Sequence, residues 1–215
     1  MPSTRARILI ADDHTLVCEL CKKLLEPEFT VVGIVADGHA MVRAAHHLRP
    51  DVIVVDIAMP QLNGLDAAEK VAEVNRSVKF VYLTMNTDIQ IAAEAFRRGA
   101  SAYLLKTCAS GELVAAIREV MRGGSYVSDR FSRDELRFLR YKRVTQMDEA
   151  ERLTERQREV LQLLAEGRMM KEVAVTLNMK IRTVAFHKYR IMGKLGVSTN
   201  AELVRYAVKN HIVAA

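Results

Sequence analysis

The first half of the chain alternates short apolar runs with stretches whose apolar residues recur at helical spacing, and this alternation constrains the fold most strongly. The apolar runs, which predict five strands, cover residues 7–11, 30–36, 51–57, 79–84 and 102–105. The stretches between and after them predict helices over residues 14–25, 39–48, 65–74, 88–98 and 110–121. Strands that alternate with helices favour an α/β fold, a five-stranded parallel sheet covered on both faces. Right-handed crossovers leave few topologies, and the doubly wound strand order 2-1-3-4-5 is expected.

The pattern changes after Gly123 and Gly124, which are expected to end the last of these helices. Residues 125–150 are rich in Arg, Asp and Glu and place Phe131 at helical spacing with Leu136 and Phe138, which predicts a partly helical linker. Only helical patterns follow, over residues 155–166, 171–177, 182–195 and 200–210. The predicted organisation is therefore an α/β domain (1–124), a linker (125–150) and an all-α domain (151–215).

Charge is distributed unevenly between the two halves. Residues 1–124 carry 14 Lys and Arg against 15 Asp and Glu, and residues 125–215 carry 18 against 11, which together make the chain's 32 and 26. A basic C-terminal half beside a nearly neutral N-terminal half favours contact of the C-terminal half with a polyanion such as double-stranded DNA.

Several classes of protein are disfavoured by the composition. The apolar runs are too short to cross a bilayer, and residues 1–7 lead into a strand without a signal-peptide core, so a cytoplasmic protein is expected. The three cysteines Cys18, Cys21 and Cys108 cannot all pair, and no further ligands complete the zinc motif that Cys18 and Cys21 could begin, so we interpret these two as buried or half-buried thiols.

Polar residues stand at the carboxyl ends of four predicted strands, where open parallel sheets bind ligands. In chain order they are Asp12, Asp13, Asp56, Thr84 and Lys106. Three crowded carboxylates are tolerable when a hard divalent cation lies among them, and an oxygen-only ligand set suits Mg²⁺. Asp56 leaves a buried strand for a Met-Pro loop and can act as a nucleophile that accepts a phosphoryl group. Lys106 can then pair with that group and Thr84 can hydrogen-bond it.

These residues resemble the flavodoxin-like receiver domain of two-component response regulators over residues 7–122. The resemblance is carried by Asp12-Asp13, by Val54-Val55-Asp56-Ile57-Ala58-Met59-Pro60, by Asn63-Gly64, by Thr84 and by the run from Gly99 to Lys106. It implies phosphorylation of Asp56, Mg²⁺ on Asp13, Asp56 and the Ala58 carbonyl with Asp12 acting through water, and a switch formed by Thr84 and Tyr103. Two residues depart from the usual pattern: Thr107 replaces a common proline, and the bulky Met85 follows Thr84. We hypothesise that Met85 slows phosphoryl entry or hydrolysis.

The C-terminal half contains the pattern of two short helices joined by a turn. Val173, Ala174 and Leu177 form the inner face of the first helix, and Val184, Ile191 and Leu195 that of the second, with His187 packing beside it. A basic outer face on the second helix can lie in a major groove. The DNA-facing candidates on this helix are Arg182, Thr183, Ala185, Phe186, Lys188, Tyr189 and Arg190.

This half resembles the LuxR-type helix-turn-helix domain over almost its whole length. The matching segments are 153–161, 165–167, 171–174, Thr183-Val184, His187 and 194–197. A receiver joined to such a domain is similar to the NarL/FixJ family. Three residues depart from that pattern: Met169 and Met170 replace small polar residues, and Ala185 stands where a lysine commonly reaches DNA.

The expected function is a two-component response regulator and transcription factor, phosphorylated by a sensor histidine kinase or a small phosphodonor, and not an enzyme. Binding a two-fold operator requires a homodimer, and the resemblance implies that residues 200–210 form its contact. A phosphoaspartyl hydrolase is disfavoured because Ala58 occupies the general acid's place, and a dinucleotide enzyme because no Gly-rich turn follows the first strand. The remaining alternative is a regulator that works without phosphorylation, by protein contacts or constitutive DNA binding.

Overall fold

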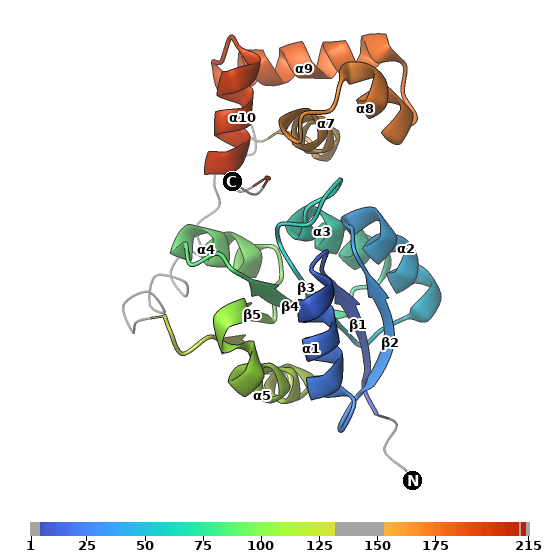
Figure 1. The fold of residues 1–215 in the computed structure, drawn as a ribbon, viewed down its shortest axis with the longest axis vertical. Coiled ribbons are helices and arrows are strands. Elements are labelled where there is room, and N and C mark those ends of the chain that lie inside the picture. Colours follow the sequence, from blue (N-terminus) through green and yellow to red (C-terminus); the bar gives the residue numbers. More distant parts are fainter. Residues whose placement is uncertain (1–4, 132–152, 211, 214–215) are drawn as a thin grey trace.

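The structure, a computed structural model, describes residues 5–131, 153–210 and 212–213. Figure 1 shows two parts, a sheet domain flanked by helices (residues 5–131) and a helical domain above it (residues 153–210 with 212–213). Residues 132–152, which include most of the predicted linker (125–150), lie outside the described residues. Within the described ranges, no helix combines the length and the apolar character that crossing a bilayer requires.

The sheet is parallel and has six strands in the order β2-β1-β3-β4-β5-β6. The strands are β1 (Arg7–Ala11), β2 (Thr30–Val35), β3 (Val52–Val55), β4 (Lys79–Thr84), β5 (Ala102–Leu105) and β6 (Tyr126–Val127). The predicted doubly wound order of the first five is confirmed, and each begins and ends within two residues of its predicted bounds.

The prediction of only five strands was wrong, because Tyr126 and Val127 pair with Ala102 and Tyr103 of β5. These two residues fall within the predicted linker (125–150). A two-residue strand has too little alternation to be recognised in a sequence, and it is held here by backbone bonds such as Ser128 N–H to the Tyr103 carbonyl (2.9 Å).

Helices cover both faces of the sheet, as expected for strands that are buried on both sides. They are α1 (Thr15–Leu25), α2 (Gly38–Leu48), α3 (Gly64–Val74), α4 (Ile89–Arg97) and α5 (Ala109–Met121), with a 3-10 turn at Lys106–Cys108. One core cluster contains Leu9, Ile53 and Tyr82 with residues of α2, α3 and α4, and the other contains Ile8, Val54 and Leu104 with residues of α1 and α5. Successive residues of a strand thus point to opposite cores.

The helical domain consists of α7 (Glu155–Ala165), α8 (Met170–Thr176), α9 (Ile181–Leu195) and α10 (Asn200–Lys209). A capping box begins α7, since Gln157 N–H donates to the Thr154 hydroxyl (3.3 Å) and Thr154 N–H donates to Gln157 Oε1 (3.0 Å). Val160, Val173, Val184, Ile191 and Ala207 are fully buried and join the four helices into one core.

An ionic cluster ties the end of α4 to α3. Arg98 pairs with Glu94 (2.6 Å) on α4 and with Asp66 (2.7 Å) on α3, and Glu94 also binds Arg97. Burial alone would raise the pKa of Glu94, but hydrogen bonds from Arg97 and Arg98 and their charges lower that pKa to about 2. Because the pKa is depressed in the folded state, Glu94 stabilises the fold above its ordinary pKa of 4.5, and this contribution is lost as the pH falls toward 2.

We therefore expect Glu94→Gln to lower the free energy of unfolding by about 1–2 kcal/mol at pH 7, after allowance for partial solvent screening. The difference from the unmodified protein should shrink as the pH falls from 4.5 toward 2, because Glu94 is then increasingly protonated in the folded state. Urea denaturation at a series of pH values measures it, with Glu19→Gln on the exposed face of α1 as the control. A difference independent of pH would contradict this origin.

Candidate functional site

The acidic residues predicted to meet at one edge of the sheet do meet there. β1 and β3 are neighbours, with Ala11 opposite Val55, so the residues that follow both strands lie side by side. Asp56 N–H donates to the Ala11 carbonyl (2.8 Å), which fixes the start of the β3–α3 loop (residues 56–63) against the end of β1. This placement of Asp12 beside Asp56 was the central spatial prediction of the sequence analysis, and the structure confirms it.

Asp12, Asp13, Asp56 and His14 form a cluster whose possible ligand atoms all lie within 4.8 Å of one another. Asp12 and Asp56 are buried, at 4 % and 3 % exposure, whereas Asp13 and His14 face solvent. The three carboxylates offer oxygen ligands at an open rim, which is the donor set of a hard divalent cation. The residues therefore fit a metal such as Mg²⁺.

Lys106 brings a positive charge into this cluster. Its ammonium lies 2.7 Å from Asp12 Oδ2 and 2.8 Å from Asp56 Oδ2, and its side chain is only 7 % exposed. Burial alone would lower the pKa of Lys106, but Asp56 and Asp12 beside it raise that pKa, so the ammonium stays charged. Burial raises the pKa of Asp56, and the charge of Lys106 opposes this shift. A divalent cation or an incoming phosphoryl group would therefore meet the carboxylates of Asp12 and Asp56 together with the ammonium of Lys106.

Thr84 and Tyr103 are linked through the backbone of one residue. Thr84 is 3 % exposed, and its hydroxyl accepts a hydrogen bond from Asn86 N–H (3.1 Å). The Tyr103 ring is fully buried, and its hydroxyl donates to the Asn86 carbonyl (3.0 Å). A change at the Thr84 hydroxyl therefore acts on the same short segment that holds the Tyr103 ring.

The β3–α3 loop is held closely against the sheet. A Cβ on Gly64 would lie 2.0 Å from the Asp56 carbonyl oxygen, so only glycine fits where α3 begins. Ala58 N–H donates to Asp56 Oδ1 (3.3 Å), and the Ala58 side chain is exposed at the rim. Met85, the bulky residue after Thr84, is 65 % exposed.

The helix-turn-helix predicted for the second half is α8 followed by α9. Asn178 in the turn has φ +51°, a left-handed conformation that asparagine tolerates, and Met179 N–H closes the turn on the Ala174 carbonyl (2.8 Å). Met169 precedes α8 without a side-chain cap, as expected from its sequence, although Glu172 accepts a hydrogen bond from Met169 N–H (2.7 Å).

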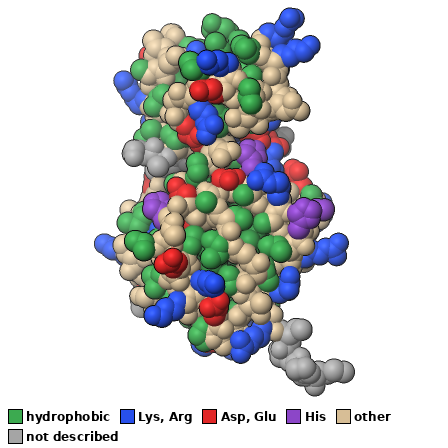
Figure 2. All heavy atoms as spheres, turned by 45° about the vertical axis from the view of Figure 1, so that its right-hand side comes forward, with side chains coloured by type: hydrophobic (Ala, Val, Ile, Leu, Met, Phe, Trp, Pro, Cys, Tyr) green, Lys and Arg blue, Asp and Glu red, His purple; other side chains and the backbone are tan. Residues whose placement is uncertain are grey.

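One face of α9 is open to solvent. Arg182, Phe186, Tyr189 and Arg190 are exposed, Thr183, Ala185 and Lys188 are half-buried, and His187 packs half-buried beside the core. Arg190 lies over the Phe186 ring, 5.5 Å from its centroid. On the face drawn in Figure 2, Lys and Arg side chains stand out at the end formed by the helical domain. The helix thus combines cationic and aromatic side chains on its free face.

Comparison with known families identifies both domains. Residues 8–118 match the response regulator receiver domain, and residues 151–207 match the bacterial regulatory proteins of the luxR family. The chain is a response regulator. Its combination of a receiver with a LuxR-type helix-turn-helix places it with the NarL/FixJ-type regulators.

Known response regulators align over nearly the whole chain. The transcriptional regulatory protein LiaR of Bacillus subtilis is 34% identical over 209 residues, which cover 96% of this chain and 99% of LiaR. The oxygen regulatory protein NreC of Staphylococcus haemolyticus is 33% identical over 214 residues, 96% of this chain and 99% of its own. Both relatives are regulatory proteins by name.

Solved structures of the RcsB response regulator are similar to this chain over both of its domains. One from Salmonella typhimurium is 27% identical, covers 94% of this chain and 96% of its own, and has a TM-score of 0.64. A second RcsB structure, from Salmonella enterica serovar Typhimurium, is bound to a promoter in the presence of the phosphomimetic BeF3-. It has the same identity and coverage of this chain, covers 98% of its own, and has a TM-score of 0.60.

Two features of this response regulator's sites escaped sequence reasoning. His14 joins the acidic cluster, with Nδ1 3.0 Å from Asp12 Oδ1 and 2.9 Å from Asp13 Oδ1, and its only signal was its place directly after the acidic pair. The β3–α3 loop contacts α7 of the helical domain through Asn63 N–H, which donates to Gln162 Oε1 (2.8 Å). No feature of the sequence pattern of α7 indicated that Gln162 contacts the β3–α3 loop.

Proposed function

We propose that this response regulator is a transcription factor whose DNA binding is controlled by phosphorylation of Asp56. The observation that supports the proposal best is that Asp12, Asp13, Asp56 and Lys106 converge at one rim of the sheet. The same chain presents a solvent-exposed face on α9, the second helix of the helix-turn-helix. The phosphodonor is a sensor histidine kinase or a small acyl phosphate, and the site of action is the cytoplasm.

Asp56 is the nucleophile in this proposal. One of its carboxylate oxygens forms a bond to phosphorus while the bond from phosphorus to the donor breaks, and the donor leaves with that electron pair. Asp13, Asp56 and the Ala58 carbonyl, with Asp12 nearby, would hold Mg²⁺, and the bound ion would supply screening of the charge on the transferred group. Lys106, already 2.8 Å from Asp56 Oδ2, pairs with a phosphoryl oxygen, and the Thr84 hydroxyl donates a hydrogen bond to another.

In this proposal the Thr84 hydroxyl moves toward the phosphoryl group, and the movement reaches the Tyr103 ring through the backbone of Asn86. The site then has two conformations, and phosphorylation favours one of them. The phosphorylated protein binds a two-fold operator as a homodimer, with two α9 helices about one DNA turn apart and α10 at the dimer contact.

A mobility-shift titration of full-length protein on selected genomic fragments, with and without acetyl phosphate and Mg²⁺, tests the proposal. We expect acetyl phosphate to lower the apparent dissociation constant about 10-fold, within the range of allosteric coupling energies. Equal binding with and without the phosphodonor would favour the alternative, a regulator that binds DNA constitutively or works by protein contacts.

The proposed DNA-contacting set on α9 consists of the exposed residues Arg182, Phe186, Tyr189 and Arg190 and the half-buried residues Thr183, Ala185 and Lys188. Arg182→Ala should weaken binding and reduce the slope of log affinity against log salt by about one unit, because one phosphate contact is lost. Arg118→Ala on α5 of the sheet domain removes an equal charge far from α9 and should leave the slope unchanged. A slope unaltered by Arg182→Ala would remove this residue from the interface.

A further inference from the structure

The open face of α9 has an apolar centre. Arg182, Ala185, Phe186, Tyr189 and Arg190 follow one another at helical spacing, which places them on one side of the helix. The two arginines stand at the ends of this row, and the three residues between them carry no charge. Phe186 is 55 % exposed and Tyr189 is 67 % exposed. We call Ala185, Phe186 and Tyr189 the α9 apolar patch.

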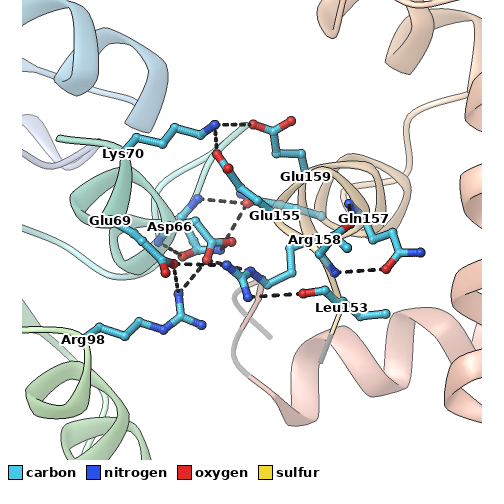
Figure 3. Close-up of polar contacts among 12 residues, drawn as sticks. Asp66, Glu69, Lys70, Arg98, Leu153, Glu155, Gln157, Arg158 and Glu159 are labelled. Carbon is cyan, nitrogen blue, oxygen red and sulfur yellow. Dashed lines mark hydrogen bonds and ion pairs between the residues drawn. The ribbon is translucent and has the colours of Figure 1, made fainter. Parts of the chain in front are cut away.

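The sheet domain leaves this patch open to solvent. It contacts α7, whose polar residues Glu159 and Gln162 are only 3 % and 1 % exposed. Glu159 pairs with Lys70 of α3 (3.1 Å), one of several ion pairs between the two helices (Figure 3). α9 packs on α7 and α8, and Figure 1 shows α7 between α9 and the sheet domain. Large apolar side chains that stay exposed together, as Phe186 and Tyr189 do, are typical of a binding surface.

Neighbouring side chains hold the two rings of the patch in place. The Arg190 guanidinium lies 5.5 Å from the Phe186 ring centroid, and the His187 ring meets the Phe186 ring edge to face, with 5.8 Å between the centroids. The Lys188 ammonium lies 6.0 Å from the Tyr189 ring centroid. Side chains that are already held lose less conformational freedom on binding, so the patch is prepared for a ligand.

The charges around the patch indicate which ligand it meets. Arg182, Lys188 and Arg190 surround it, and the sequence of α9 contains neither Asp nor Glu. Such a surface is complementary to the phosphates that line both sides of a DNA groove. When the cations contact phosphates and the helix lies in the major groove, the centre of its face meets the edges of the bases.

The chemistry of Phe186 restricts which base edge it can contact favourably. Its side chain has neither a hydrogen-bond donor nor an acceptor, and the same holds for Ala185. Base pairs present donors and acceptors in the major groove, and among the four bases only thymine adds an apolar group there, its C5 methyl. Against any other base, the Phe186 ring would cover polar groups without pairing them.

We propose that the α9 apolar patch selects thymine through its C5 methyl group, with Phe186 as the residue that contacts the methyl. Each half-site of the operator then carries an adenine–thymine pair opposite Phe186, with the thymine methyl against the ring. The inference rests on the proposed function for the binding of DNA by α9, and it adds the base that α9 selects.

The test uses full-length protein with acetyl phosphate and Mg²⁺. A duplex enriched by this protein from a random-sequence pool serves as the probe, and it is also synthesised with uracil in place of every thymine. Uracil pairs with adenine by the same hydrogen bonds and lacks only the C5 methyl. Three variants are compared: Phe186→Ala, Phe186→Leu, and the control Met121→Ala, which shortens an exposed apolar side chain at the end of α5. Circular dichroism confirms that each variant is folded.

The unmodified protein should bind the thymine duplex about 10-fold more tightly than the uracil duplex, because one methyl group is buried in each of two half-sites. Phe186→Ala should bind the thymine duplex about 10-fold more weakly and the two duplexes equally. Phe186→Leu, which keeps an apolar side chain, should retain a preference of about threefold. Met121→Ala should keep the preference of the unmodified protein.

Equal affinity of the unmodified protein for the two duplexes would overturn the selection of thymine by its methyl group. A preference that persists unchanged in Phe186→Ala would overturn the role of Phe186, since another residue or the shape of the DNA would then account for it. If the unmodified protein enriches no duplex from the pool, DNA binding itself fails, and the proposed function is overturned together with this inference.

Discussion

Replacing Asp56 with asparagine should abolish labelling of the protein by a radioactive small acyl phosphate. Asp56 is buried at the sheet edge, directly after the central strand β3. It contacts Lys106 and belongs to the carboxylate cluster. An amide oxygen carries no full charge and attacks phosphorus poorly, so loss of the nucleophile should lower the labelling rate by about 10³-fold or more.

The matched control is Asp51→Asn. Asp51 directly precedes the same strand β3 at its other end, where it is exposed and accepts a hydrogen bond from Arg7 N–H (2.8 Å). Labelling of this variant should equal that of the unmodified protein. Label retained in Asp56→Asn would indicate a different acceptor and would falsify the assignment of Asp56.

The position of the acidic cluster could be predicted because it follows from topology alone. Parallel strands place their carboxyl ends at one edge, so Asp12 and Asp56 had to meet once the strand order 2-1-3-4-5 was inferred. Lys106 and Thr84 follow by the same rule, from the ends of β5 and β4. The helix-turn-helix could also be predicted from the sequence, because the spacing of Val173, Val184 and Ile191 specifies which face of each helix is buried.

The contact between the two domains could not be predicted by such a rule. Periodicity shows that Glu159 and Gln162 share a face of α7, but a polar face is the pattern of a helix side that water covers. Their burial depends on a second polar surface, Asp66, Glu69 and Lys70 on α3, more than 80 positions away in the chain. Complementary charges on two distant helices have no signature within either helix.

Among the contacts that could not be predicted from the sequence, we expect those of Asp66 to contribute most to the stability of the fold. Asp66 is 2 % exposed, and its Oδ1 pairs with Arg98 of α4 (2.7 Å) and with Arg158 of α7 (2.8 Å). Its Oδ2 accepts from Asn63 Nδ2 (2.9 Å), so one carboxylate joins α4, α7 and the β3–α3 loop. In the sequence it is an ordinary acidic residue in the first turn of a helix.

We expect Asp66→Ala to lower the free energy of unfolding of the full-length protein by about 3–5 kcal/mol, because it leaves two largely buried guanidinium groups facing each other. Urea denaturation followed by circular dichroism measures the loss. Asp66→Asn retains a hydrogen-bond acceptor but removes the charge, so its loss should be smaller than that of the alanine variant.

The control for this variant is Glu28→Ala, which breaks the exposed pair with Arg118 and should leave stability nearly unchanged. A loss below about 1 kcal/mol for Asp66→Ala would mean that Glu94 and Glu69 neutralise Arg98 and Arg158 without it. In that case the carboxylate would not be the centre of the cluster, and the junction of α3, α4 and α7 would depend on the hydrogen bonds of Gln162 to the loop instead.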